Sequence, residues 1–218
     1  MLDKSQVQAV LFDLDGTLMD TDDQAVEALA RRLRRLHWPH AEQAARRFVM
    51  AVESPAAVAV TLVDLLGLDV RLAALAQRLR CSPTQEVEFR IMDGIEAMLA
   101  ELNGRYRLGV VTTRPGCDAE RFLAQHGLGS LLSTVVSGES TRRLKPNPEP
   151  VRFAAQALGV PAERCIMVGD TPVDMRAARR AGAWAVGVLC GFGGRRELER
   201  AGAHVILERT AEVAALLR

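Results

Sequence analysis

Apolar residues follow two different patterns along this chain, and the change between them suggests how it is organised. The apolar run from Val7 to Phe12, broken only by Gln8, is short, which is typical of a buried strand. Between about Thr21 and Arg90, apolar residues recur at helical spacing, as at Leu29 and Leu33, and no segment alternates as a strand. We therefore expect helices at about 21–36, 41–52, 55–66 and 70–79.

From Gly94 onward, helical and strand patterns alternate. The expected helices are 95–102, 117–125, 148–158, one ending at 181, and one at the C-terminus. The expected strands are 108–111, 134–137, 165–168, 183–189 and one near 205–207. Alternation of this kind predicts βαβ units and a parallel sheet. We expect an α/β core domain from residues 1–19 and 91–218, and an inserted all-helical domain at 20–90 that acts as a lid.

Composition limits the classes of function. The chain has 218 residues, and its 28 basic and 27 acidic residues give a net charge of +1, which provides no overall electrostatic attraction for nucleic acid. No apolar run is long enough for a membrane span and no signal peptide is visible, so a cytoplasmic location is expected. The four cysteines are scattered without a CxxC pair, which argues against zinc, and we expect them to be reduced.

Candidate chemistry gathers where the expected strands end. Asp13 and Asp15 follow the first strand, and Thr112 and Thr113 follow the strand at 108–111. The carboxyl ends of parallel strands meet at one edge of the sheet, where ligands bind. The threonine hydroxyls suit a phosphate group. For each piece alone a structural role is also open: Asp15 in a turn, Asp13 or the threonines as helix caps.

Two more segments belong to the same edge. Asp170 follows the strand at 165–168, and because neighbouring carboxylates repel unless a cation lies between them, Asp13 and Asp170 together suggest Mg²⁺. Asp174 is open to three interpretations: a metal ligand, a residue that orients a ligand, or a residue favourable to its helix dipole. Lys145 lies in a proline-rich loop and could keep a nucleophilic aspartate ionised and bind phosphate.

These segments, in this order, resemble the haloacid dehalogenase superfamily of phosphohydrolases. The matching motifs are Asp13-Leu14-Asp15-Gly16-Thr17-Leu18, Thr112, Lys145-Pro146, and Gly169-Asp170 with Asp174. The helical insert after the first motif looks like the C1 cap of the phosphoglycolate phosphatase-like group, and the core would be Rossmann-like. Thr113 departs from the pattern, because many relatives have asparagine there.

The resemblance implies a Mg²⁺-dependent phosphatase of a small phosphorylated metabolite, working through an aspartyl-phosphate. Asp13 would be the nucleophile and Asp15 the acid and base. Asp13, Asp170, the backbone carbonyl of Asp15 and, as a further metal-site residue, Asp174 would hold the metal. Thr112, Thr113 and Lys145 would bind the phosphoryl group.

Other interpretations stay open at this point. A phosphomutase of the β-phosphoglucomutase type would use the same core residues, and a binding or regulatory protein could keep the fold without turnover. As for partners, we expect a small metabolite, no nucleic acid and no membrane, with the protein a monomer or homodimer.

Overall fold

The structure is a computed structural model, and it describes residues 4–20, 30–35, 41 and 88–218. The chain divides into two compact units, Met1–Met19 with Val87–Arg218, and Asp20–Glu86. In the second unit, residues 30–35 are helical, as expected. The remaining expected helices of the lid lie outside the described residues. The boundary between core and lid at residues 90 and 91 stays a prediction.

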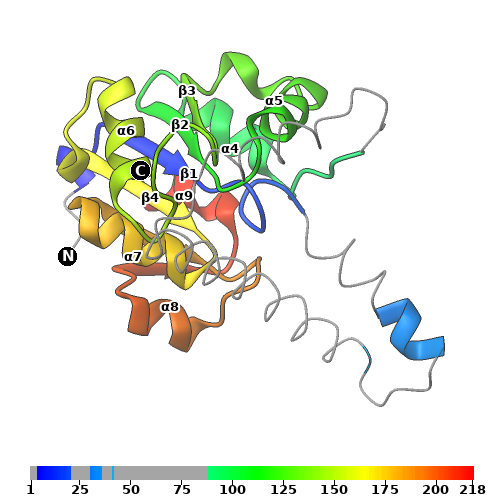
Figure 1. Ribbon diagram of the computed structural model, residues 1–218. Helices are drawn as coiled ribbons and strands as arrows, with labels where there is room; N and C mark the ends of the chain where they lie inside the picture. The colour runs from blue at the N-terminus through cyan, green and yellow to red at the C-terminus, as the bar shows by residue number, and fades with distance from the viewer. Residues whose placement is uncertain (1–3, 21–29, 36–40, 42–87) are drawn as a thin grey trace. The chain divides into compact units, whose positions relative to one another are not determined.

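A single six-stranded sheet forms the centre of the first unit (Figure 1), and every strand pairing in it is parallel. The strand order is β3-β2-β1-β4-β5-β6. The strands are β1 (Ala9–Phe12), β2 (Arg107–Val111), β3 (Thr134–Val136), β4 (Cys165–Gly169), β5 (Trp184–Val188) and β6 (Val205–Leu207). β1 is central because the chain adds β2 and β3 on one side and then β4 to β6 on the other. This reversal of direction makes the ends of β1, β2 and β4 the expected place for a site.

Helices cover both faces of this sheet, and each face has its own apolar core. One core includes side chains of α4 (Ile95–Leu102), α5 (Gly116–Gln125) and α9 (Val213–Leu216). The other includes side chains of α6 (Glu149–Ala157), α7 (Pro172–Ala181) and α8 (Arg195–Ala201). Short 3-10 helices lie at Lys4–Gln6, Leu128–Ser130, Ala162–Arg164 and Thr210–Glu212.

Strand β1 shows why its sequence is apolar throughout. Val10 and Phe12 pack into the first core, while Ala9 and Leu11 pack into the second. A strand that is covered on both faces needs apolar side chains at every position instead of at alternate ones. The apolar run that predicted a buried strand therefore follows from the central place of β1 in the sheet.

The structure confirms the expected fold class of the core, an α/β fold with a parallel sheet, and places each expected strand. It also shows one helix that the pattern did not predict, α8. Cys165 and Cys190 are free thiols, but Cys117 takes part in a disulfide bond. The expectation that all four cysteines are reduced is therefore wrong for Cys117.

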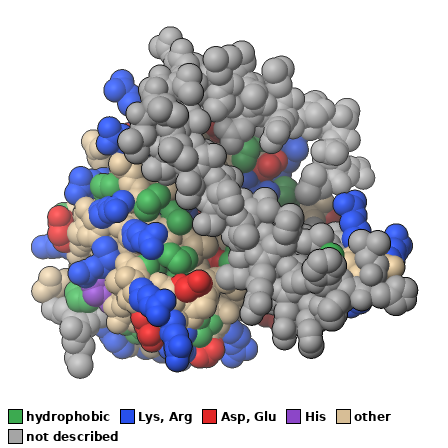
Figure 2. Space-filling view, turned by 60° about the horizontal axis from the view of Figure 1, so that its bottom comes forward, with side chains coloured by type: hydrophobic (Ala, Val, Ile, Leu, Met, Phe, Trp, Pro, Cys, Tyr) green, Lys and Arg blue, Asp and Glu red, His purple; other side chains and the backbone are tan. Residues whose placement is uncertain are grey.

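Exposed charges of both signs lie on the side of the core that Figure 2 turns toward the reader, where α8 lies. On α8 these are Arg195, Arg196, Glu197, Glu199 and Arg200. The near-balance of charge in the whole chain is thus also found locally on this helix. Among the described residues, no helix is long and apolar enough to cross a membrane.

Candidate active site

The first strand delivers Asp13 to the centre of the sheet edge. The Asp13 backbone N–H still donates to the Val168 carbonyl of β4, at 2.8 Å, so the strand pairing continues up to this residue. The side chain is almost fully buried, with 7% exposure. Asp13 therefore stands between the ends of β2 and β4, directly after the first strand as the sequence predicted.

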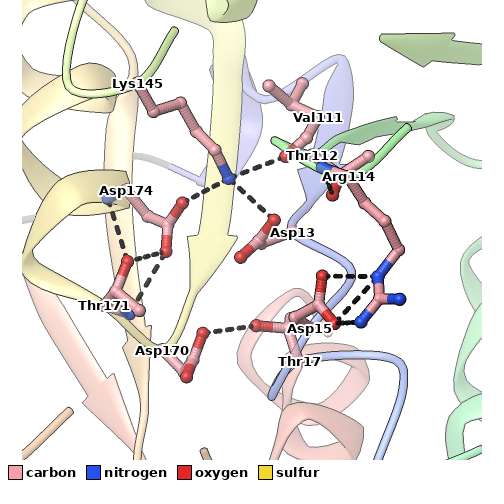
Figure 3. Close-up of polar contacts among 10 residues, drawn as sticks. All are labelled: Asp13, Asp15, Thr17, Val111, Thr112, Arg114, Lys145, Asp170, Thr171 and Asp174. Carbon is pink, nitrogen blue, oxygen red and sulfur yellow. Dashed lines mark hydrogen bonds and ion pairs between the residues drawn. The ribbon is translucent and has the colours of Figure 1, made fainter. Parts of the chain in front are cut away.

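Lys145 contacts two carboxylates and one backbone carbonyl at this edge of the sheet (Figure 3). Its Nζ donates to Asp13 Oδ1 at 2.7 Å, to Asp174 Oδ1 at 2.6 Å and to the Val111 carbonyl at 2.9 Å. The side chain is buried, so solvent screens these ion pairs little. Burial alone would lower the pKa of this ammonium, but the attraction of Asp13 and Asp174 outweighs burial and raises it. Lys145 is therefore held as a cation beside Asp13.

Asp170 is fixed by a close cradle of backbone. Its Oδ2 accepts from the Phe192 N–H at 2.8 Å, and its Oδ1 accepts from the Thr17 hydroxyl at 3.3 Å. A Cβ added at Gly16 would lie 2.4 Å from Asp170 Oδ2, and one added at Gly191 would lie 2.2 Å from it. Two glycines are thus needed so that the chain can approach this carboxylate on two sides.

Asp174 has a structural role as well as a place in the cluster. Its Oδ2 accepts from the Thr171 N–H at 3.1 Å and the Thr171 hydroxyl at 2.5 Å, and Thr171 in turn accepts from the Asp174 N–H. This reciprocal pair is a capping box at the start of α7. Its Oδ1 holds Lys145. Of the three roles that the sequence left open, a favourable helix start is observed, and Asp174 in addition holds Lys145. That Asp174 binds a metal or orients a metal ligand stays a prediction.

The arrangement could hold a divalent cation. Asp13, Asp170 and Asp174 each offer a carboxylate oxygen, and these oxygens lie within 4.8 Å of one another. Burial and then the charge of Asp174 raise the pKa of Asp13 to about 7, although Lys145 acts to lower it. One ammonium therefore does not balance the negative charge here. Hard oxygen ligands in excess of positive charge fit a metal such as Mg²⁺.

Asp15 turns away from this cluster, as Figure 3 shows. Its half-buried carboxylate forms an ion pair with Arg114, whose Nε lies 3.0 Å from both carboxylate oxygens and whose Nη2 also donates to Oδ1. The side chain of Asp15 is therefore separate from the three carboxylates that could share a cation. That its backbone carbonyl contributes a metal ligand stays a prediction.

The two threonines after β2 differ in their surroundings. Thr112 is buried, and its hydroxyl accepts from the Arg114 N–H at 3.0 Å, while Thr113 is exposed. Neither caps the next helix, because the N-cap residue of α5 is Pro115 and has no side-chain cap. The structure therefore brings Thr112 to the site edge through its strand, and gives Thr113 no comparable burial.

Sequence reasoning assigned no partner to Arg114 or Thr171, although the side chains of both contact candidate site residues. Nothing in the sequence links Arg114 to Asp15, because the two residues follow different strands. Thr171 had a usable signal, because Thr171-Pro172-Val173-Asp174 has the spacing of a capping box. Both residues act by orienting a carboxylate.

A comparison of the chain with models of protein families identifies its family. The model of the haloacid dehalogenase-like hydrolase family matches residues 10–188, which include every candidate site residue. The chain belongs to this family. The resemblance carried by the strand-end motifs is therefore confirmed.

Individual relatives of this haloacid dehalogenase-like hydrolase cover most of the chain. A phosphoglycolate phosphatase from Cupriavidus necator is 33% identical over 96% of this chain and 92% of its own. A validoxylamine A 7'-phosphate phosphatase from Streptomyces hygroscopicus is 31% identical over 83% of this chain and 85% of its own. A crystal structure of a putative β-phosphoglucomutase from Thermotoga maritima superposes with a TM-score of 0.70, at 25% identity, over 97% and 98% of the two chains. The expected class of enzyme, a phosphatase of this family, is confirmed.

Proposed function

We propose that this protein is a Mg²⁺-dependent phosphatase that hydrolyses a small phosphorylated metabolite through an aspartyl-phosphate on Asp13. The observation that carries the proposal is the buried cluster of Asp13, Asp170 and Asp174 at the end of the central strand, in which Lys145 binds Asp13 and Asp174. Such a cluster costs stability, because three carboxylates are buried with one ammonium. Binding of a cation and a phosphate dianion at this site explains why the protein keeps such a costly arrangement.

In the proposed first step, a carboxylate oxygen of Asp13 attacks phosphorus as the bond to the alcohol oxygen of the substrate breaks. Asp15 donates a proton to that leaving oxygen. In the second step Asp15 accepts a proton from water, whose oxygen attacks phosphorus and releases phosphate and the free Asp13 carboxylate. Lys145 holds Asp13 in place and offsets charge on the phosphoryl oxygens, and the Thr112 hydroxyl binds one of them.

The proposed metal ligands are Asp13 and Asp170, with the carbonyl of Asp15 and with Asp174 beside them. When bound, Mg²⁺ supplies positive charge between the nucleophile and the phosphate. The chain itself keeps Asp170 ready for this role, since the Phe192 N–H and the Thr17 hydroxyl fix its carboxylate. The proposed ligands thus need little rearrangement.

The relatives do not agree on a substrate, since their names give phosphoglycolate in one case and validoxylamine A 7'-phosphate in another. We therefore place this enzyme by its chemistry, as a phosphomonoesterase of small metabolites. A β-phosphoglucomutase-type activity is the second candidate, because the putative mutase from Thermotoga maritima shares its fold over nearly the whole chain.

A screen of purified protein separates these candidates. Phosphoglycolate, sugar phosphates and an aryl phosphate are each incubated with enzyme and Mg²⁺, and both inorganic phosphate and sugar phosphate isomers are measured. Phosphate release that is lost in Asp13→Asn supports the phosphatase. Formation of an isomer without phosphate release supports the mutase, and no reaction with any compound contradicts both.

A further inference from the structure

Arg114 binds the carboxylate of Asp15 in a fixed geometry. Its Nε and Nη2 both face Asp15, and both carboxylate oxygens accept from the guanidinium. A planar guanidinium that binds a carboxylate at two nitrogen atoms fixes the orientation of that carboxylate as well as its distance. The rotamer of Asp15 is thus set by a residue that follows a different strand.

The guanidinium is itself held from other directions. The ring of Phe89 lies beneath it, with the guanidinium carbon 5.9 Å from the ring centroid, and Asp118 Oδ2 lies 3.9 Å from Nη1. The backbone of Arg114 is fixed by its N–H bond to the Thr112 hydroxyl. An arginine that is stacked, paired and anchored in this way presents a preset binding group to Asp15 instead of a loose surface charge.

We propose that Arg114 is a positioning residue for Asp15. By binding Asp15, Arg114 keeps this acid/base carboxylate away from the metal site and oriented for proton transfer. The inference rests on the proposed function, because it assigns Arg114 a role in the same reaction. The inference also goes beyond the proposed function, because no motif or relative described above assigns Arg114 a role.

The need for such a residue follows from the position of Asp15 in the chain. Asp15 lies two residues after Asp13, and its charge adds to the repulsion at Asp13. A carboxylate so close to a divalent cation binds it unless another partner holds it, and a carboxylate on the metal cannot carry protons to and from the substrate. Displacement of a catalytic group by about 1 Å can cost roughly 100-fold in rate. Arg114 is the partner that prevents this.

The test uses two substrates that differ in their need for an acid. An alkyl phosphate has a poor leaving group and needs a proton from Asp15, whereas p-nitrophenyl phosphate has a good leaving group and needs none. Asp15 also accepts a proton from water in the second step, which both substrates share, so the comparison uses kcat/KM, which reports only the steps up to release of the alcohol. We expect Arg114→Met to lower kcat/KM for the best alkyl phosphate by about tenfold or more, while kcat/KM for the aryl phosphate changes less than about threefold. Arg121→Met is the matched control, because Arg121 lies on the following helix and pairs with Asp118 instead of Asp15; both rates should stay near wild type.

A double-mutant cycle shows whether the effect passes through Asp15. In an Asp15→Asn background, Arg114→Met should change kcat/KM for the alkyl phosphate by less than about twofold. Equal losses of kcat/KM on both substrates, or a further loss in the Asp15→Asn background, would overturn the proposal, because Arg114 would then act on the substrate directly. If Arg114→Met does not fold by circular dichroism, Arg114→Lys, which keeps the charge but lacks the planar fork, takes its place.

A second readout separates this proposal from the proposed function. Wild type, Arg114→Met, Asp15→Asn and the double variant are unfolded in urea without substrate or metal. If Arg114 and Asp15 are coupled, the losses in free energy of unfolding from the two substitutions should be less than additive. Additive losses would contradict the ion pair. If the coupling is present but wild-type protein releases phosphate from no substrate, the proposed function fails while the pairing stands.

Discussion

Replacement of Lys145 by methionine should strongly destabilise the folded core. Methionine is similar in length and fits an apolar surrounding, but it leaves Asp13 and Asp174 buried without the ammonium that lies 2.7 Å and 2.6 Å from them. Removal of one partner from a buried ion pair costs about 3–5 kcal/mol. For a protein of this size each kcal/mol lowers Tm by about 2–4 °C, so the expected loss is roughly 6–20 °C.

The same substitution should have a particular pH dependence. The pKa of Asp13 is raised to about 7 in the folded protein from 3.8, so the folded state binds more protons than the unfolded state between these values. Wild-type protein should therefore lose the contribution of this group as pH rises through 7. Without Lys145 the pKa of Asp13 rises further, since the ammonium acts to lower it. The cost of Lys145→Met should then be largest at pH 8 and smaller at pH 5.

Urea unfolding in metal-free buffer, followed by far-ultraviolet circular dichroism at pH 5 and pH 8, measures this. Lys4→Met is the matched control, because Lys4 is the other lysine of the chain and is exposed. Its free energy of unfolding should stay within about 0.5 kcal/mol of wild type. A loss below about 1 kcal/mol for Lys145→Met at pH 8, or an equal loss at both pH values, would refute the reasoning about buried charge.

Three further predictions concern the metal and its supports. Gly191→Ala places a Cβ 2.2 Å from Asp170 Oδ2, so the Mg²⁺ concentration for half-maximal activity should rise several-fold, whereas Gly129→Ala, which meets nothing within 4 Å, should leave it unchanged. Thr210→Val removes the hydroxyl that donates to the Thr17 carbonyl at 2.8 Å, so the free energy of unfolding should fall by about 1–3 kcal/mol, and Thr210→Ser should recover most of it; equal losses would count against the hydrogen bond. Chelation of divalent ions should stop phosphate release and added Mg²⁺ should restore it; undiminished turnover in excess chelator would exclude a metal role.

The sequence predicted the sheet well because its strands are buried on both faces. A short apolar run such as 7–12, in which only Gln8 is polar, can be recognised as a strand without alternation when turn residues follow it. Helix α8 was not predicted because it is short and only Leu198 and Ala201 are buried in it, so its apolar periodicity is weak.

The strand-end residues could also be placed from sequence, since parallel strands bring their carboxyl ends to one edge. Side-chain partners could not, because they depend on rotamers and on loops far apart in the chain. Arg114 and Asp15 illustrate this: nothing local to either residue predicts their ion pair. The double role of Asp174, which caps α7 with Thr171 and holds Lys145, likewise became visible only in three dimensions.

The central claim is that Asp13 becomes phosphorylated during turnover. Enzyme mixed with its best substrate and Mg²⁺ is quenched in acid within milliseconds, digested, and analysed by mass spectrometry, with Asp13→Asn as the control. The account predicts one added phosphate on the peptide that contains Asp13, lost on treatment with hydroxylamine and absent from the variant. Phosphate on a different residue, or turnover at the wild-type rate by Asp13→Asn, would contradict it.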